Sequence, residues 1–446
     1  MSIKPYENFM QHAWDGGLRR KSKGSKEPLV LSSVQCGLVR RLTSNRHDQP
    51  GHIAQGGRIM VIAAIEMGLG KTLAALAALC VLRGTGTASV KALFVVPKST
   101  LFDTWRRQRR AFTNLTGRSL IVVTYARLQR AYLNGWSRRT SSSRYSVWLR
   151  GKGDKLLESK RELVVFDESH VLRNPNTLLA RAAAILSINA RRVLCLTGTP
   201  VHNGPADASG QLRAMGSGSY MEDPAEFGTR AMLLNDPVRL FASKFVYNAT
   251  LADAGVILPP KLSKTLWVNH ELGAQSVTTY NTSLRAVTGT TDRKIEDIDE
   301  EFDDDAMPGT VRHNLLIMRQ LCVEPALFHK HGRAEFDDTA RYLTVASPGP
   351  KLRAALDLVR QLVFEGHSKI VIVSEFVALL DTFKDLASMK LDERCLSFDG
   401  RRSAHARSRV IDEFLNGESR LLCLSLGAGA YGLNLVRPRF CFPCRY

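Results

Sequence analysis

The sequence predicts an α/β protein with two domains, each built on a parallel β-sheet that helices cover on both faces. Short continuous apolar runs alternate with helical patterns in two separate parts of the chain. Apolar runs of about four to eight residues between turns are typical of strands buried on both faces. The chain has 446 residues, which is too long for one hydrophobic core and suggests two or three domains.

The expected strands of the first half are separated by helical stretches. They cover Ile59–Ile65, Lys91–Val96, Leu120–Val123, Leu163–Phe166 and Arg192–Leu196. Beyond a Pro- and Gly-containing segment at Ser347–Pro350, a second alternation predicts a helix, then a strand, three times over. These elements cover Lys351–Phe364, Lys369–Val373, Ala378–Leu386, Arg394–Phe398, Ala404–Leu415 and Arg420–Leu424.

Composition divides the chain into four segments. They are a basic flexible tail over 1–28, the first α/β domain over 29–204, a region of helices and loops over 205–345, and the second α/β domain over 346–446. The basic cluster Arg19–Lys26 is a solvated tail, a nuclear-import signal or a DNA-contacting arm. Gly135–Arg161 predicts a long basic surface loop, which touches DNA or is merely solvated. The acidic run Asp292–Asp305 predicts a mobile loop that shields a basic groove or is simply solvated.

The charge balance favours a polyanionic partner. The chain carries 62 Lys and Arg against 42 Asp and Glu, a net charge of +20. Such an excess favours nucleic acid, although a basic surface without a partner is the alternative. No apolar run is long enough to cross a bilayer and the N-terminus lacks a signal-peptide core, so we expect an intracellular protein without membrane contact. Cys441 and Cys444 form a CxxC without a second pair, so no structural zinc is expected.

The segment Glu66–Thr72 predicts a phosphate-binding loop between a buried strand and an Ala- and Leu-rich helix. Its glycines, Gly68 and Gly70 on either side of Leu69, let backbone N–H groups converge on phosphate oxygens at the start of the helix. Lys71 would reach the β- and γ-phosphates of ATP, and the Thr72 hydroxyl would bind Mg²⁺. The alternative is an ordinary Gly-rich entry to a helix.

The strand Leu163–Phe166 ends in two adjacent carboxylates, Asp167 and Glu168. The C-terminal ends of parallel strands share one edge of a sheet, so these carboxylates would lie on the same edge as Lys71. Asp167 would hold Mg²⁺ and Glu168 would polarise the attacking water in phosphoryl transfer. An isolated Asp-Glu pair is otherwise just a strand end, and the following Leu196–Pro200 is otherwise a structural turn.

The order of these motifs resembles the Swi/Snf-like family of helicase-related, DNA-dependent ATPases in helicase superfamily two. Matching segments run from about Leu29 to Val436 and follow the family's order. They are Glu66–Thr72, with Ile65 where the family has aspartate; Val95–Trp105, similar to motif Ia; Asp167–Thr177, similar to the DEAH box; Leu196–Asn203, similar to motif III; Met318–Leu327, with Glu324 in place of a histidine; Ile370–Phe376, similar to motif IV; and Ser425–Leu435, similar to motif V.

This resemblance implies two RecA-like lobes that bind ATP and Mg²⁺ and translocate on double-stranded DNA. It places Gln35 at the family's adenine-reading glutamine, although the glycine that follows stands one residue early. The DNA contacts that it implies are Lys98, Ser99, Thr197, Gly429 and Asn434. Chromatin remodelling or DNA repair in the nucleus, with nucleosomes or repair proteins as partners, is the expected setting.

Motif VI, with its paired arginines, is expected after motif V but is not found after Val436. Arginines of this kind contribute ~10³-fold or more to phosphoryl transfer, and the last strand of the second lobe is expected to be missing too. An incorrect gene model, a truncated paralogue or a partner that supplies the arginines would explain this. The alternative function is therefore a catalytically impaired ATP- and DNA-binding fragment; an ATPase that does not act on nucleic acid is a weaker alternative.

Overall fold

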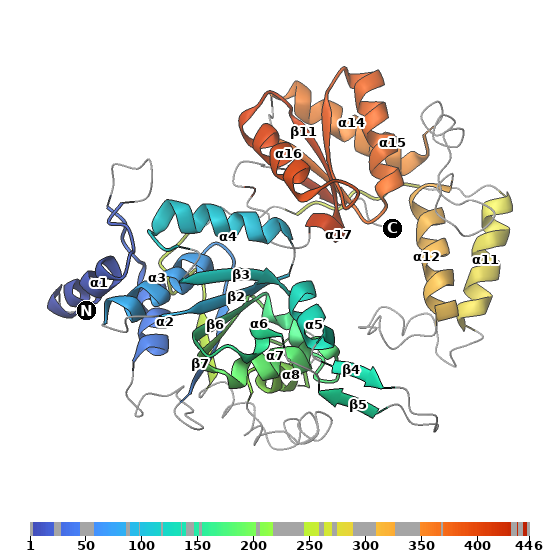
Figure 1. The fold of residues 1–446 in the computed structure, drawn as a ribbon. Helices are drawn as coiled ribbons and strands as arrows, with labels where there is room; N and C mark the ends of the chain where they lie inside the picture. Colours follow the sequence, from blue (N-terminus) through green and yellow to red (C-terminus); the bar gives the residue numbers. More distant parts are fainter. Residues whose placement is uncertain are drawn as a thin grey trace. The chain divides into compact units, whose positions relative to one another are not determined.

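A computed structural model of the chain forms two compact units, Met1–Pro260 and Lys261–Tyr446 (Figure 1). The structure describes residues 3–21, 28–44, 58–85, 90–97, 99–116, 119–134, 136–139, 147–150, 154–201, 206–216, 245–257, 263–269, 274–288, 309–325, 348–366, 369–429, 435 and 440–443. Within these residues, no helix has the length and apolar character needed to span a membrane. The four-segment division stays a prediction.

The first unit contains a six-stranded sheet in the order β3-β2-β6-β7-β1-β8, and all of its pairings are parallel. Its strands are β1 (Ile59–Ile65), β2 (Ala92–Val96), β3 (Leu120–Thr124), β6 (Arg161–Asp167), β7 (Ala190–Thr197) and β8 (Val246–Ala249). The expected strands are confirmed, because continuous apolar runs are the mark of strands buried on both faces. The sequence did not predict β8, which is short and only partly apolar.

Helices cover both faces of this sheet, so its inner strands β1, β2, β6 and β7 are almost wholly buried, whereas the edge strands β3 and β8 are partly exposed (Figure 1). One face carries α5 (Tyr125–Asn134), α6 (Lys155–Glu158), α7 (Leu178–Ile188) and α8 (Ala206–Ala214). The other carries α2 (Ser33–Thr43), α3 (Lys71–Gly84) and α4 (Ser99–Phe112). This doubly covered sheet positions the candidate site at the ends of β1, β6 and β7.

Two expectations outside the sheet are wrong. Residues 3–21 are not a flexible tail: α1 (Ile3–Asp15) packs on α3 and buries Phe9, Met10 and Ala13, whose spacing places them on one helix face. The basic cluster beyond Lys21 lies outside the described residues. The segment expected to be a loop contains an antiparallel hairpin of β4 (Trp136–Arg139) and β5 (Val147–Arg150), followed by α6.

The second unit contains a four-stranded parallel sheet in the order β10-β11-β9-β12. Its strands are β9 (Ile370–Ser374), β10 (Cys395–Phe398), β11 (Leu421–Ser425) and β12 (Phe440–Pro443). One face packs on α14 (Pro350–Phe364) and α15 (Val377–Leu391), and the other on α16 (Ala404–Asn416) and α17 (Leu426–Gly429). The expected alternation is confirmed. A further strand, β12, follows motif V and pairs with β9, whereas the expected loss of the last strand of the second lobe stays a prediction.

Two further helices of this unit, α11 (Ala274–Thr288) and α12 (Gly309–Val323), pack on each other. Glu324, which stands where the resemblance expects histidine, directly follows α12. Its carboxylate is buried and accepts a hydrogen bond of 2.9 Å from the backbone N–H of Gly349, the N-cap of α14. A negative charge is favourable at a helix N-terminus, so Glu324 links α12 to α14.

Candidate active site

The glycine loop joins β1 to α3 and has the backbone that its glycines permit. Gly68 and Gly70 have φ angles of +89° and +75°, which side-chain-bearing residues rarely adopt. A Cβ atom at Gly70 would also stand 2.3 Å from Gln35 Nε2. The loop therefore presents its backbone at the N-terminus of a 14-residue helix, an arrangement that favours phosphate oxygens.

Gln35 lies against this loop and is buried. Its Nε2 donates a hydrogen bond of 3.1 Å to the carbonyl of Leu69. Its Oε1 accepts from the backbone N–H of Ser32, and the Ser32 hydroxyl accepts from the N–H of Gln35, which makes a capping box at the start of α2. The structure thus brings Gln35 to the loop residues with which the sequence predicts it to act, whereas contact with an adenine stays a prediction.

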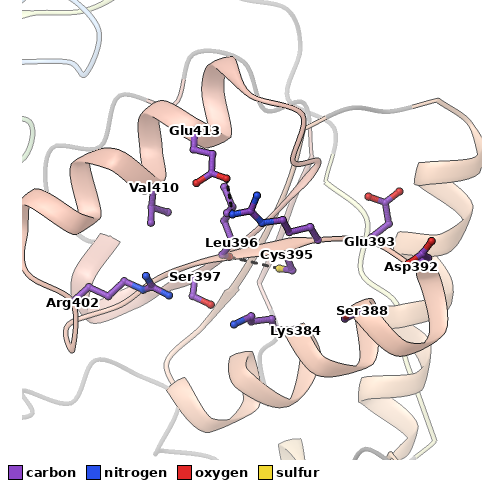
Figure 2. Close-up of a pocket in the computed structure, with 11 residues that line it drawn as sticks. Lys384, Ser388, Asp392, Glu393, Cys395, Leu396, Ser397, Arg402, Val410 and Glu413 are labelled. Atoms are coloured by element: carbon purple, nitrogen blue, oxygen red, sulfur yellow. Dashed lines mark hydrogen bonds and ion pairs between the residues drawn. The ribbon is translucent and has the colours of Figure 1, made fainter.

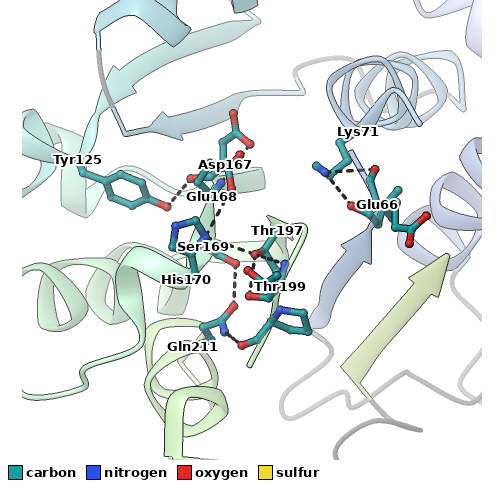
Figure 3. Close-up of polar contacts among 12 residues, drawn as sticks. Glu66, Lys71, Tyr125, Asp167, Glu168, Ser169, His170, Thr197, Thr199 and Gln211 are labelled. Carbon is teal, nitrogen blue, oxygen red and sulfur yellow. Dashed lines mark hydrogen bonds and ion pairs between the residues drawn. The ribbon is translucent and has the colours of Figure 1, made fainter. Parts of the chain in front are cut away.

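Lys71 points toward the start of its own loop. Its ammonium donates hydrogen bonds to the carbonyls of Ile65, at 2.7 Å, and Glu66, at 3.4 Å (Figure 3). Burial lowers the pKa of Lys71, and the negative charges of Glu168 and Asp167 partly oppose this shift. The ammonium is therefore within electrostatic range of both carboxylates, as the shared sheet edge predicts.

Hydrogen bonds to β8 and the residue beyond it fix Glu66, the first residue of the glycine loop, and the sequence did not predict this role. The backbone N–H of Glu66 donates to the carbonyl of Ala249 at 3.0 Å. The Glu66 carboxylate accepts a hydrogen bond of 2.6 Å from the N–H of Leu251, just beyond β8. Glu66 is thereby held away from the carboxylate pair, on the opposite side of Lys71 in Figure 3.

Asp167 ends β6 as a nearly buried carboxylate, 8% exposed. Its Oδ2 accepts a hydrogen bond of 2.8 Å from the indole Nε1 of Trp105, and its Oδ1 accepts from the N–H of Glu168 at 3.1 Å. Burial raises the pKa of Asp167 to about 6, although the Trp105 hydrogen bond opposes the shift. No described residue forms an ion pair with it, so the site holds a buried negative charge that a bound cation would neutralise.

Glu168 follows in a left-handed conformation, with a φ angle of +50°. Non-glycine residues adopt this region rarely, and such residues cluster at functional sites. Its carboxylate lies 3.5 Å from His170 Nδ1. Burial raises the pKa of Glu168, and the positive charge of Lys71 lowers it. The left-handed turn separates the roles of two adjacent carboxylates, since Asp167 points toward Trp105 and Glu168 toward His170.

A buried polar bridge connects this turn to the end of β7. The Ser169 hydroxyl donates to Gln211 Oε1 at 2.7 Å, and Gln211 Nε2 donates to the carbonyl of Pro200 (Figure 3). Ser169 and Gln211 are both fully buried. Sequence reasoning missed Gln211 because it belongs to no motif and lies on α8. The sequence signal for this role is weak: Gln211 is a polar residue beside the apolar residues Leu212 and Ala214, which face the core.

The donor set of the Asp167 region fits Mg²⁺, which prefers carboxylate and hydroxyl oxygens. Asp167 supplies a buried carboxylate that forms no ion pair with a described residue, and Thr72 supplies a hydroxyl at the first turn of α3. These two residues would hold the ion together with phosphate oxygens of a bound nucleotide. The charge of the ion would compensate the carboxylate that burial now disfavours.

The residues expected to contact DNA are only partly described. Lys98 and Asn434 lie outside the described residues, Ser99 begins α4, and Gly429 ends α17. Thr197 is fully buried, and its hydroxyl accepts a hydrogen bond from the N–H of Thr199 at 3.1 Å. The Thr197 side chain therefore shapes the turn, and a contact between Thr197 and DNA stays a prediction.

A cavity of about 390 Å³ lies in the second unit, beside β10 and between α15 and α16 (Figure 2). Lys384 and Arg402 point into it near Ser397. Arg394 and Glu413, which also line it, form an ion pair at 2.8 Å. Its lining contains neither the glycine loop nor the carboxylate pair, so the candidate site is the polar edge of the first sheet.

Comparison with family models decides the classification. The SNF2-related domain matches residues 55–327, more than half of the chain. The chain belongs to the SNF2-related family. A second model, the helicase conserved C-terminal domain, matches residues 351–442. The expected family and enzyme class, a helicase-like ATP hydrolase, are confirmed, and the second match extends to residue 442, beyond the end of the segments matched in the sequence at about Val436.

Similar proteins come from viruses, bacteria and eukaryotes. A "probable global transactivator" of Orgyia pseudotsugata multicapsid polyhedrosis virus is 26% identical over 84% of this chain and 73% of its own length. An uncharacterised ATP-dependent helicase of Mycoplasma pneumoniae is 25% identical over 98% of this chain and 38% of its own length. The ISWI chromatin-remodeling complex ATPase ISW2 of Saccharomyces cerevisiae is 26% identical over 84% and 33%. The chain thus spans well under half the length of the latter two relatives.

Among solved structures, the chain is similar to the SWI2/SNF2 ATPase core of Sulfolobus solfataricus in complex with dsDNA. The identity is 19%, the similarity covers 93% of this chain and 82% of that one, and the TM-score is 0.42. The Hef helicase domain of Pyrococcus furiosus has 16% identity, covers 87% of each chain, and has a TM-score of 0.45.

Proposed function

We propose that this SNF2-related chain is an ATP-driven translocase on double-stranded DNA that hydrolyses ATP at the edge of its first sheet. The observation that carries the proposal is that the glycine loop with Lys71 and the Asp167–Glu168 pair follow strands that end at one edge of the first sheet. The parallel register places the ends of β1 and β6 on either side of the end of β7, with Ala64 beside Thr197 and Asp167 beside Leu196. The mutual effects of Lys71, Asp167 and Glu168 on their pKa values agree with this placement. A glycine loop at a helix N-terminus completes a site suited to a nucleoside triphosphate with a divalent cation.

The side chains divide the reaction between them. The loop N–H groups and Lys71 would bind the β- and γ-phosphates, and Lys71 would exchange its hydrogen bonds with the carbonyls of Ile65 and Glu66 for phosphate oxygens. Asp167 and Thr72 would hold Mg²⁺, which neutralises charge on the phosphate oxygens when bound. Glu168 would orient and polarise the attacking water, and its raised pKa brings it closer to the pKa expected of a general base.

The DNA part of the proposal rests on charge and on family. The net charge of +20 favours a polyanion, and one similar solved structure is described as a complex with dsDNA. The proposed contacts are mainly with phosphates, through the start of α4 at Lys98 and Ser99 and through Gly429 and Asn434, so binding should weaken steeply with salt. Nucleosomes or repair proteins as partners, and the nucleus as location, stay predictions, since the relatives include viral and mycoplasma proteins.

The test measures ATP hydrolysis by the 446-residue chain with and without double-stranded DNA, beside Lys71→Ala and Glu168→Gln. The expected result is turnover that DNA stimulates and that both substitutions reduce by at least ~100-fold. Glu168→Gln should still bind ATP, because it removes the water-polarising group and leaves the loop intact.

Two outcomes would contradict the proposal. Nucleotide binding that depends on Lys71 without any turnover would support the impaired ATP- and DNA-binding fragment instead. Turnover that DNA does not change, together with no salt-sensitive DNA binding, would support an ATPase that does not act on nucleic acid.

A further inference from the structure

Trp105 lies in the middle of α4 and is almost completely buried, with 1% of its surface exposed. Its ring packs edge-to-face on Phe94 of β2, with a centroid distance of 4.8 Å and an interplanar angle of 82°. Aromatic pairs favour this geometry. Because Phe94 belongs to a central strand of the sheet, the contact fixes the orientation of the indole.

The indole N–H uses its single hydrogen bond on Asp167. It donates to Oδ2 at 2.8 Å, across 62 residues of sequence. The other carboxylate oxygen accepts from the N–H of Glu168, and the Tyr125 hydroxyl donates to the backbone carbonyl of Asp167 at 2.9 Å. The position of the strand end and the rotation of its carboxylate are therefore both fixed by uncharged donors.

An uncharged donor has a particular consequence at this place. An arginine or lysine beside Asp167 would also orient the carboxylate, but its positive charge would compete with a metal ion. An indole N–H orients an oxygen and leaves the negative charge available, and each carboxylate oxygen retains lone pairs for a cation. Outer-shell donors of this kind typically change metal affinity by about 10- to 100-fold.

We propose that Trp105 is a positioning residue that holds the Asp167 carboxylate in the orientation that binds the Mg²⁺ of Mg·ATP. The inference rests on the proposed function and deepens it, because it assigns a role to a residue outside the nucleotide loop and the carboxylate pair. Trp105 itself touches neither the nucleotide nor the ion in this assignment; it acts through Asp167.

The test compares nucleotide affinity with and without Mg²⁺, which isolates the metal from the rest of the nucleotide. The probe is an ATP carrying a fluorescent N-methylanthraniloyl group, and its anisotropy gives the Kd in excess Mg²⁺ and in EDTA. Trp105→Phe keeps an aromatic ring and removes the N–H. The expected result is a Kd that rises by about 10- to 100-fold in Mg²⁺ and changes less than about threefold in EDTA.

Tyr125→Phe is the matched control. It also removes a hydrogen bond to Asp167, but one that the backbone carbonyl accepts and not the carboxylate. Its ratio of the two Kd values should stay close to that of the unchanged protein. To keep the ring volume constant, Trp105 is also replaced by benzothienylalanine, which has the shape of tryptophan with sulfur in place of the N–H. This variant should lose Mg²⁺ dependence as Trp105→Phe does.

A benzothienylalanine variant with an unchanged ratio would overturn the inference and leave Trp105 a packing residue only. An equal loss in Tyr125→Phe and Trp105→Phe would overturn it too, since the effect would then follow the strand end and not the carboxylate. If the unchanged chain binds the probe neither in Mg²⁺ nor in EDTA, the proposed function fails, which is a different result from an unchanged ratio.

Discussion

Two buried carboxylates follow parallel strands in the two units, and their surroundings are opposite. Asp167 ends β6 in the first unit and Asp399 follows β10 in the second; they are 8% and 3% exposed. Among the described residues, only uncharged groups donate hydrogen bonds to Asp167, and burial raises its pKa to about 6. Burial also acts to raise the pKa of Asp399, but the hydrogen bonds and charge of Arg401 outweigh it and hold that pKa below its usual range.

The two carboxylates differ in whether a protein cation neutralises them. Asp399 is paired with Arg401, whereas Asp167 forms no ion pair with a described residue. Arg401 donates to both oxygens of Asp399, at 3.1 and 3.0 Å, and also pairs with Asp381. Such a network stabilises the turn between β10 and α16 and pairs both oxygens of Asp399 with a protein cation. Burial disfavours the ionised form of Asp167 when no cation is bound, and a buried charge of this kind is typical of a functional site.

The largest expected difference between the two carboxylates is in catalysis. Asp167→Asn should lower the rate of ATP hydrolysis by at least ~100-fold, because it removes the charge that would hold Mg²⁺. Asp399→Asn should change the rate per folded molecule less than about threefold. Steady-state hydrolysis at saturating DNA, with the folded fraction checked by circular dichroism, measures both. Comparable losses in the two variants would remove the functional side of the comparison.

The second difference concerns stability: Asp167→Asn should have a higher free energy of unfolding than the wild-type chain. A pKa raised from 3.8 to about 6 means that the ionised carboxylate disfavours folding by about 3 kcal/mol at neutral pH. The asparagine loses about 1 kcal/mol of hydrogen bonding, so the net gain in unfolding free energy should be about 2 kcal/mol. Denaturant unfolding at pH 7.5 in EDTA measures it.

The pH dependence of that gain gives a second check. Because the folded pKa lies above the unfolded one, the penalty is complete above pH 6 and disappears as the pH falls toward 4. The advantage of Asp167→Asn should shrink over the same range. A gain that stays constant between pH 7.5 and pH 4.5 would mean that it does not come from the buried charge.

The opposite effect is expected at Asp399. Asp399→Asn should lower the free energy of unfolding by about 1.5 kcal/mol, because hydrogen bonds to a charged partner are lost. Since the folded pKa is depressed, this carboxylate stabilises the fold above its unfolded pKa and stops doing so as the pH falls below about 4. The deficit of the variant should therefore be complete at pH 7 and should decrease as the pH falls from about 4 through the folded pKa. A deficit that does not change between pH 7 and pH 3 would point to packing instead of charge.

Both carboxylates could be located from the sequence, but not what distinguishes them. Continuous apolar runs identified the central strands, and the residues that follow such strands lie by topology at one sheet edge. That reasoning predicts Lys71 near Asp167 and Glu168, and the register places the ends of β1, β7 and β6 side by side at this edge. It failed for α1 and β8, whose apolar patterns are short and mixed with polar residues.

The partners of the site could not be predicted because they come from distant positions of the chain, and the resemblance of Val95–Trp105 to motif Ia does not point to Asp167. Trp105 is 62 residues from Asp167, and Gln211 is 42 residues from Ser169. A tryptophan in an amphipathic helix predicts burial, not a hydrogen bond to one particular carboxylate. The left-handed backbone of Glu168 could not be predicted either, because glycine and asparagine are the residues that usually indicate this conformation and the residue here is glutamate.

The smallest expected effect lies at Asp381, the other partner of Arg401. The Arg401 side chain is 60% exposed, and its bonds to Asp381 are 2.8 and 2.9 Å long. Solvent weakens such a pair, so Asp381→Asn should lower the free energy of unfolding by only about 0.5 kcal/mol, against about 1.5 kcal/mol for Asp399→Asn. Denaturant unfolding of both single variants and the double variant at low and high salt measures the ranking. If Asp381→Asn lowers the free energy of unfolding more than Asp399→Asn does, the main partner of Arg401 is Asp381. Arg401 would then neutralise Asp399 only in part, and the contrast between Asp399 and Asp167 would be smaller than stated above.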